Sequence, residues 1–214
     1  MIEVAREEDV WTVTLNRPDK ANALTEEMLR DLTRVMREAQ QARAVILTGA
    51  GKVFSAGADL EAARAGLATS STWEELSAAV ASLPGLTVTA LNGTLAGGAM
   101  GMALACDMRI AVPSARFFYP VMKLGFLPQP SDPPRMAALI GPARTKLILM
   151  GGQKIDAENA LRFGLIDRIV PAEQLLAEAQ ELVADTRAAE PDFARQIKDM
   201  CHSPLSLAPP AGHF

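Results

Sequence analysis

The sequence predicts an α/β fold, because apolar strand-like runs alternate with amphipathic helical segments along most of the chain. The 214 residues are enough for one sizeable core. We see no internal repeat and no low-complexity linker that would divide the chain. We therefore expect a core domain over residues 1–190, followed by a shortened C-terminal helix and tail over 191–214.

In the first half, Thr25 is expected to begin a helix, since Glu26 and Glu27 in the first turn favour a helix N-terminus. Thr72 and Glu75 have the spacing of a capping box, which predicts a second helix start. The elements expected here are strands over 1–4, 4–16, 43–48 and 86–91, and helices from Thr25 and over 71–83.

In the second half, five prolines between Pro120 and Pro134 predict one irregular segment. Helical patterns return after it and dominate the remaining core. The elements expected here are strands over 108–112 and 116–118, and helices over 97–105, 135–139, 143–150, 156–163 and 173–188. Right-handed crossovers are the rule for such strand and helix successions.

The charge pattern excludes several classes of partner. The formal net charge is −4 and no long basic run occurs, so nucleic acid and anionic membranes are poor partners. Acidic residues interrupt the N-terminal segment and no run of about 18 apolar residues exists, so we expect no signal peptide and no membrane span. Cys106 and Cys201 lack metal-like spacing. We expect a cytoplasmic protein with reduced cysteines and no bound metal.

Two glycine-containing stretches are the most informative features of the chain. Phe54–Leu60 and Asn92–Gly101 each follow an apolar run and open into helix-forming sequence, which leaves backbone N–H groups free. Two such N–H groups can stabilise an oxyanion, each by about 3–4 kcal/mol in a transition state. The alternative interpretation is that Gly57, Gly97 and Gly98 only permit tight turns and close packing.

These stretches resemble the crotonase (enoyl-CoA hydratase/isomerase) superfamily. The matching segments cover nearly the whole chain in order: 16–24, 44–49, 54–60, 92–101, 106–107 and 157–167. The resemblance implies the crotonase (ClpP/crotonase-like) fold of stacked ββα units. It also implies an acyl-CoA substrate with no cofactor besides that coenzyme A, and a homotrimer or a dimer of trimers.

The resemblance places the oxyanion-binding amides at Ala58 and Gly98. It implies that Lys20 and Ala21 line the CoA nucleotide, where Lys20 could pair with a phosphate or remain a solvated surface lysine. The backbone of Asp59 would help to hold CoA, while its side chain is expected to cap a helix. The substrate-binding positions so implied are Lys20, Ala21, Ala56, Gly57, Asp59, Leu60, Gly97 and Val121.

The chain departs from the family at two catalytic positions. The hydratases carry two glutamates that activate water, and these positions correspond to Gly101 and Val121 here. Neither residue can transfer a proton, and loss of a general acid or base typically costs about 10²- to 10⁴-fold in rate. Hydratase activity is therefore not expected.

Two other residues are candidates for the missing proton transfer. Asp132 lies where some family members place a working carboxylate, although an Asx-type turn residue ahead of Pro133 is the favoured alternative interpretation. Tyr119 could donate a hydrogen bond to a carboxylate or an oxyanion, or could simply pack in the core. A Ser-His-Asp triad is not expected, because the histidines, His202 and His213, lie in the last thirteen residues.

The sequence thus indicates an enzyme that acts on an acyl-CoA thioester through an enolate. Decarboxylation or isomerisation is favoured over hydration, since loss of CO₂ needs no base and an isomerisation can use one residue. The alternative is a catalytically inactive homologue that binds acyl-CoA or supports a partner subunit. The shortened C-terminal part would leave the pocket more open or covered by another chain.

Overall fold

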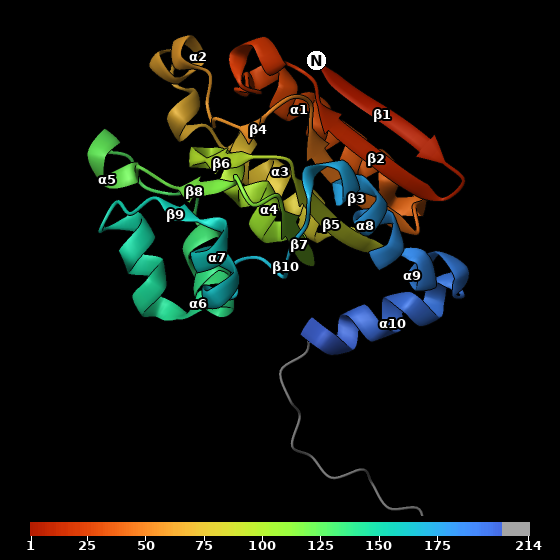
Figure 1. Cartoon of the computed structure of the whole chain (residues 1–214). Helices are drawn as coiled ribbons and strands as arrows, with labels where there is room; N and C mark the ends of the chain where they lie inside the picture. The colour runs from red at the N-terminus through yellow and green to blue at the C-terminus, as the bar shows by residue number, and fades with distance from the viewer. Residues whose placement is uncertain (203–214) are drawn as a thin grey trace, which may run out of the picture.

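A computed structural model describes residues 1–202, which form two β-sheets surrounded by helices (Figure 1). The larger sheet has six strands in the order β1-β2-β3-β5-β7-β10, and the smaller has the order β4-β6-β8-β9. The strands are β1 Ile2–Glu7, β2 Val10–Leu15, β3 Ala44–Gly49, β4 Val53–Ser55, β5 Leu86–Leu91, β6 Thr94–Ala96, β7 Met108–Ala111, β8 Arg116–Phe118, β9 Ile155–Asp156 and β10 Arg168–Ile169.

From β3 to β8, successive strands alternate between the two sheets. The pairs β3/β4, β5/β6 and β7/β8 each give one strand to each sheet, and the first two pairs lead into helices. Within each sheet these strands are parallel neighbours. This repetition is the stack of ββα units that the sequence led us to expect, and the α/β fold class is confirmed.

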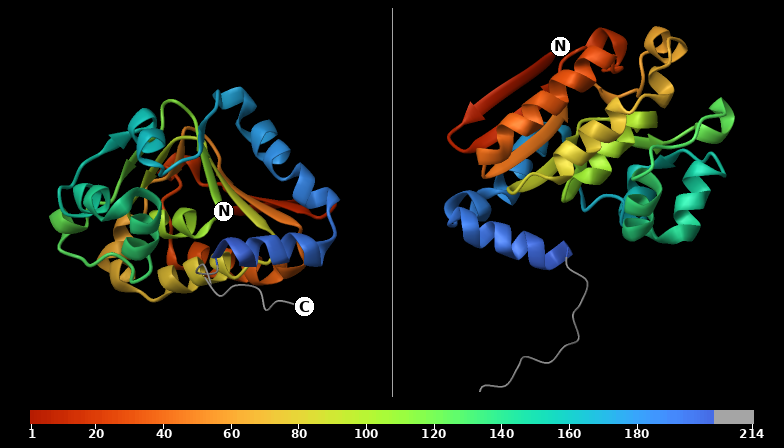
Figure 2. Two further views of the ribbon diagram at one scale, coloured as in Figure 1. Left: turned by 90° about the horizontal axis from the view of Figure 1, so that it is seen from below. Right: turned by 180° about the vertical axis from the view of Figure 1, so that it is seen from behind.

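Helices cover both faces of the larger sheet. Helices α1 and α3 pack on each other and α3 packs on α4, while α8 contacts β5 and β7 (Figure 2). The helices are α1 Glu26–Glu38, α2 Leu60–Arg64, α3 Thr72–Ala81, α4 Met100–Ala105, α5 Val121–Leu124, α6 Asp132–Leu149, α7 Ala157–Phe163, α8 Leu175–Leu182, α9 Ala184–Ala188 and α10 Pro191–His202. The 3₁₀ turns are η1 Pro18–Lys20, η2 Ala39–Gln41, η3 Leu67–Thr69, η4 Gly97–Ala99 and η5 Ala172–Gln174.

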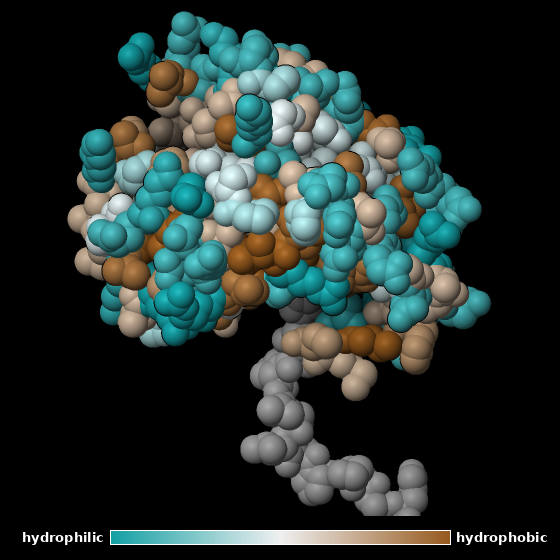
Figure 3. All heavy atoms as spheres, viewed as in Figure 1, coloured by the Kyte–Doolittle hydropathy of each residue, from teal (hydrophilic) through white to brown (hydrophobic). Residues whose placement is uncertain are grey.

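Helix α10 lies apart from the rest of the fold and is attached to it by a polar contact. Nζ of Lys198 donates to the carbonyl oxygens of Leu83 and Gly85 at 2.9 and 2.7 Å, and to Oδ2 of Asp107 at 2.7 Å. Phe193 and Ile197 of α10 remain about half exposed. Figure 3 shows hydrophobic side chains on α10 itself. No helix of the described residues is long and apolar enough to cross a bilayer.

Three local predictions differ from the structure. The expected strand over 4–16 is a hairpin of β1 and β2, which turns at Glu8 with a φ of 54°. Thr72 is the first residue of α3 and not its cap, and the N-cap residue, Ser71, makes no side-chain capping bond. The irregular part of the proline-rich segment ends at residue 131, because α6 begins at Asp132. Prolines lie in the first turn of this helix, where a missing N–H costs no helical hydrogen bond.

Candidate active site

The two glycine-containing stretches meet at one edge of the smaller sheet. Strands β4 and β6 are parallel neighbours, so their carboxyl ends lie side by side. Gly57 has a φ of +90°, and a Cβ on it would lie 2.8 Å from the carbonyl oxygen of Ala96 and 3.4 Å from Cα of Gly97. The two main chains therefore touch, and glycine is required at position 57 both by its conformation and by this close approach.

The N–H groups of Ala58 and Gly98 are available at this edge. Ala58 forms a parallel bridge with Leu24, in which Leu24 bonds to the carbonyl of Gly57 and to the N–H of Asp59, each at 2.8 Å. Since backbone polar groups alternate in direction along an extended segment, the N–H of Ala58 points away from Leu24. Gly98 lies in the first turn of η4. Within residues 1–202, no protein group accepts a hydrogen bond from either N–H.

A buried carboxyl group lies one helical turn from Gly98. Asp132 is fully buried, and its Oδ2 accepts a hydrogen bond of 2.9 Å from the hydroxyl of Tyr119. Its Oδ1 has no partner in the described part of the chain. That oxygen lies 2.8 Å from the point where a Cβ on Gly101 would stand. Gly101 follows Gly98 by three residues, a rise of about 4.5 Å in helical structure, so the carboxyl group lies near the Gly98 end of this edge.

Burial perturbs the titration of this carboxyl group. Desolvation is the largest cause and raises the pKa of Asp132 from 3.8 to about 7, with a smaller rise from the nearby Glu74 carboxylate. The Tyr119 hydrogen bond and the Arg135 guanidinium oppose this rise. Burial and the adjacent carboxyl also raise the pKa of Tyr119, which keeps its hydroxyl a donor. Near neutral pH, Asp132 can therefore act as either an acid or a base.

The structure thus joins two residues that the sequence suggested only separately. Tyr119 and Asp132 are thirteen residues apart and contact each other through their side chains. The alternative of an Asx-type turn at Asp132 is wrong, because this residue begins α6 and its side chain makes no cap. Val121 is the buried first residue of α5 and offers no group that could transfer a proton.

The expected CoA-binding segment lies beside the first glycine-containing stretch. Ala56 donates its N–H to the carbonyl of Ala21 at 3.0 Å, which places Lys20 and Ala21 next to this stretch. Lys20 is exposed at the end of η1, and Leu60 is 75% exposed. The surface beside the first glycine-containing stretch is therefore exposed on this side and carries a cation.

The predicted cap at Asp59 is confirmed. Its Oδ1 accepts from the N–H groups of Glu61 and Ala62 at 3.0 and 3.3 Å, while Oδ2 pairs with Arg17 at 2.8 Å. The Arg17 guanidinium is the largest cause that holds the pKa of Asp59 below its usual value. The sequence analysis did not find this role of Arg17, although the residue lies within the segment that resembles the family.

Glu74 is a second residue that the sequence did not suggest. Its Oε2 accepts from both the N–H and the Oγ of Ser131, at 3.2 and 3.0 Å, so α3 holds the residue that precedes Asp132. Arg135 donates to the same Ser131 hydroxyl at 2.8 Å. An acidic residue in the first turn of a helix is too common to have signalled this contact.

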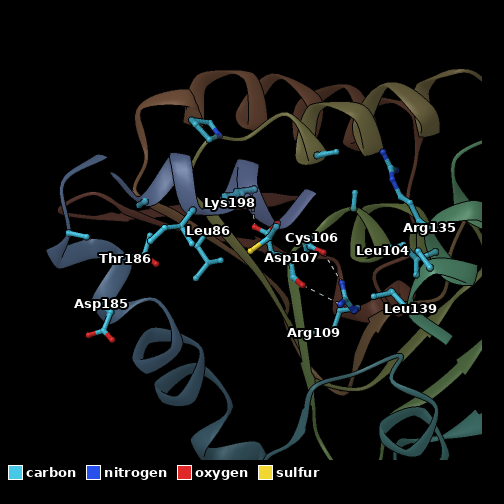
Figure 4. Close-up of a pocket in the computed structure, with 18 of the residues that line it drawn as sticks. Leu86, Leu104, Cys106, Asp107, Arg109, Arg135, Leu139, Asp185, Thr186 and Lys198 are labelled. Carbon is cyan, nitrogen blue, oxygen red and sulfur yellow. Dashed lines mark hydrogen bonds and ion pairs between the residues drawn. The ribbon is translucent and has the colours of Figure 1, made fainter. Parts of the chain in front are cut away.

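A large cavity lies elsewhere, between α10 and the body (Figure 4). It has a volume of about 730 Å³, and none of Ala58, Gly98, Tyr119 and Asp132 lines it. Arg135 and Leu139 stand at one end and Asp185 at the other, with the Lys198–Asp107 ion pair between them (Figure 4). Its walls are mainly apolar.

Comparison with known proteins agrees with the geometry. Residues 5–213 match the family model described as enoyl-CoA hydratase/isomerase. The Bacillus subtilis protein YngF, which carries the same description, is 36% identical over 203 residues, or 90% of this chain and 78% of that protein. The chain belongs to the enoyl-CoA hydratase/isomerase family.

Further relatives of this family support the assignment. A short-chain-enoyl-CoA hydratase of Clostridium acetobutylicum is 34% identical over 190 residues, which are 83% of this chain and 71% of that protein. The crystal structure of an enoyl-CoA hydratase from Bacillus anthracis superposes with a TM-score of 0.87 at 32% identity, covering 94% of this chain and 81% of the other. The fold is therefore the crotonase fold that the resemblance implied.

Proposed function

We propose that the protein isomerises an enoyl-CoA thioester by moving a carbon–carbon double bond through an enolate. The observation that carries this proposal is the position of Asp132, a single carboxyl group with one oxygen held by Tyr119 and the other free. The N–H groups of Ala58 and Gly98 would stabilise the negative charge on the thioester oxygen, and each such donor is typically worth about 10²- to 10³-fold in rate.

The proposed reaction needs one base and no co-reactant. The Asp132 carboxylate takes a proton from C2 of a 3-enoyl thioester, and the electron pair of the C–H bond forms a dienolate whose charge rests on the thioester oxygen. The Asp132 carboxylic acid then returns the proton to C4, and the double bond moves from C3–C4 to C2–C3. A carboxyl group whose pKa is about 7 suits both steps at neutral pH.

Hydration fits the site less well than isomerisation. Addition of water needs one group to activate the water and a second to protonate the substrate carbon. The two positions that correspond to the family glutamates hold Gly101 and Val121. One carboxyl group can serve a proton shuttle, whereas a hydratase of this family uses two.

Decarboxylation of a malonyl-type thioester is the second candidate, favoured by the absence of side-chain acids at Gly101 and Val121. In that reaction the C–CO₂ bond breaks and its electron pair forms the enolate. The Asp132 acid gives its proton to C2 and is later protonated again by solvent. Here the acid form of Asp132 is the active one, so the two reactions predict opposite pH profiles.

We further propose that Lys20 pairs with a CoA phosphate and that the backbone of Ala56, Gly57 and Gly97 lines the thioester. The exposed position of Lys20 beside Ala56 supports this. The CoA moiety would enter with the substrate, and no further cofactor is proposed.

A homotrimer or a pair of trimers is proposed from the resemblance. The exposed apolar residues of α10, including Phe193 and Met200 at 60% and 76%, are consistent with a partner surface. Size-exclusion chromatography with light scattering would give the mass of the assembly.

Turnover assays test the function. 3-Hexenoyl-CoA, crotonyl-CoA and methylmalonyl-CoA are each incubated with wild type, with Asp132→Asn and, as a control, with Asp192→Asn on the exposed surface of α10. We expect isomerisation of the first substrate, with a rate that rises with pH up to about 7 and that Asp132→Asn lowers by about 10²- to 10⁴-fold.

Other outcomes separate the alternatives. Release of CO₂ from methylmalonyl-CoA, with a rate that falls above neutral pH, would favour the decarboxylase. If no thioester turns over yet all bind in calorimetry, the protein is a non-catalytic acyl-CoA binder. Fast hydration of crotonyl-CoA would contradict the proposed roles of Gly101 and Val121.

A further inference from the structure

One side chain contacts both Gly98 and the segment that follows Ala58. Trp73, in the first turn of α3, is 3% exposed. Three atoms of its ring lie 3.1–3.2 Å from the point where a Cβ on Gly98 would stand. Since one of these atoms is bonded to both others, that point lies over the face of the indole. The face of the ring therefore packs against Gly98 and sets the distance between Gly98 and α3.

The other edge of the indole is bound to the segment that follows Ala58. Its Nε1–H donates to the carbonyl oxygen of Leu67 at 2.8 Å, and Leu67 is itself buried. From Ala58 to Leu67 the chain runs through Asp59, which caps α2 and pairs with Arg17. Both ends of this connection are thus held, one by an ion pair and the other by the indole.

We propose that Trp73 is a positioning residue that sets the spacing and direction of the Ala58 and Gly98 amides. Through its ring it supports Gly98, and through Leu67 it holds the segment that leads back to Ala58. This inference rests on the proposed function, because it assigns a purpose to amides that bind an oxyanion. An ordinary core residue at this place would affect stability and leave the relative preference for an enolate unchanged.

The first test separates positioning from packing. Trp73→Phe keeps an aromatic ring against Gly98 but removes the Nε1–H that bonds Leu67. The matched control is Trp11→Phe, because Trp11 is the other tryptophan of the chain and lies on β2 with Arg6 stacked 3.9 Å from its ring centre. Far-ultraviolet circular dichroism shows whether each variant is folded.

The probe is acetoacetyl-CoA, whose acidic C2–H lets it bind either as the neutral thioester or as an enolate with a near-ultraviolet absorption band. Calorimetry measures total affinity and the absorption band measures the bound enolate. We expect Trp73→Phe to bind acetoacetyl-CoA within about 2-fold of wild type but to hold about 10-fold less enolate, since a misplaced oxyanion donor loses part of a 10²- to 10³-fold effect. Trp11→Phe should match wild type in both measurements.

Equal enolate fractions in Trp73→Phe and Trp11→Phe would overturn the inference while leaving the proposed function intact. If wild type binds no acetoacetyl-CoA or forms no enolate, the proposed function fails and the inference fails with it. The two failures are therefore distinguishable in one experiment.

A second measurement leaves Trp73 unchanged. In Trp11→Phe the emission comes from Trp73 alone, because the chain has two tryptophans. With excitation at the long-wavelength edge of the tryptophan band, where the adenine of CoA hardly absorbs, we expect saturating hexanoyl-CoA to shift or quench this emission. Unchanged emission at a concentration that calorimetry shows to be saturating would contradict a contact between Trp73 and the occupied site.

Discussion

Replacing the carboxyl group of Asp132 by an amide is expected to stabilise the protein above neutral pH. In the folded protein the pKa of this group is about 7, against an ordinary value of 3.8. Between these values the folded chain holds a proton that the unfolded chain has lost, so the free energy of unfolding falls as pH rises and is level above about 7. From pH 5 to pH 8 titration of this carboxyl group lowers the free energy of unfolding by about 3 kcal/mol. The loss occurs between pH 5 and the folded pKa of about 7, at about 1.4 kcal/mol for each pH unit.

Urea unfolding at pH 5, 6, 7 and 8 measures this difference. Asp132→Asn has no proton to exchange at this site but keeps an oxygen that can accept from Tyr119. Its stability relative to wild type should therefore increase by about 3 kcal/mol over this range. The other carboxyl groups titrate in the same way in both proteins, so their contributions cancel in the difference. The control variant Asp192→Asn should therefore show a difference from wild type that does not change with pH. A difference that stays constant with pH would refute the assignment of a raised pKa to Asp132.

The remaining predictions concern the surroundings of the same carboxyl group and the attachment of α10. Glu74 raises the pKa of Asp132 and Arg135 lowers it. Glu74→Gln should therefore move the midpoint of the pH–rate profile to lower pH, and Arg135→Gln should move it to higher pH. Shifts of the same sign in the two variants would contradict this. Lys198→Met removes three hydrogen bonds that attach α10, so amide exchange in α10 should accelerate by at least about 10-fold in hydrogen-exchange mass spectrometry. As a control, Arg195→Met on the exposed face of α10 should leave the exchange rate unchanged.

The fold and the meeting of the two glycine-containing stretches could be predicted because their signals are local. Thr25 caps α1 by accepting from the N–H of Met28, as its sequence context indicated. Gly57 and Gly98 stand where apolar strands end, and parallel strands bring such ends together. These features depend on a few neighbouring residues and on the rules of strand connection, so the sequence alone contains them.

The acid–base part of the site could not be predicted in the same way. Asp132 meets Tyr119 across thirteen residues and Gly101 across thirty-one, and its raised pKa comes from burial that no local pattern encodes. The hairpin turn at Glu8 was missed because a non-glycine residue there adopts a positive φ. Trp73 resembled any buried aromatic residue of a helix until its contacts with Gly98 and Leu67 were known.

The glycine at position 101 and the aspartate at position 132 depend on each other, because a side chain at 101 and the carboxyl group of Asp132 would occupy the same space. A Cβ at position 101 would lie 2.8 Å from Oδ1 of Asp132 and 2.7 Å from Oγ of Ser77, closer than packed atoms allow. A carboxyl group can therefore enter this space from α4 or from α6, but not from both. Without a side chain at 101, the aspartate at the start of α6 fills the space and becomes buried.

A double-mutant cycle of Gly101→Glu and Asp132→Ala tests this exclusion. Gly101→Glu alone should be strongly destabilised, by about 1–3 kcal/mol from overpacking and more if two carboxylates face each other. In the double variant the glutamate gains the space that Asp132 leaves, so the coupling free energy from urea unfolding should favour the pair by at least about 1 kcal/mol. Strictly additive effects would show that the two positions do not compete, and the carboxyl group of Asp132 would then need another explanation.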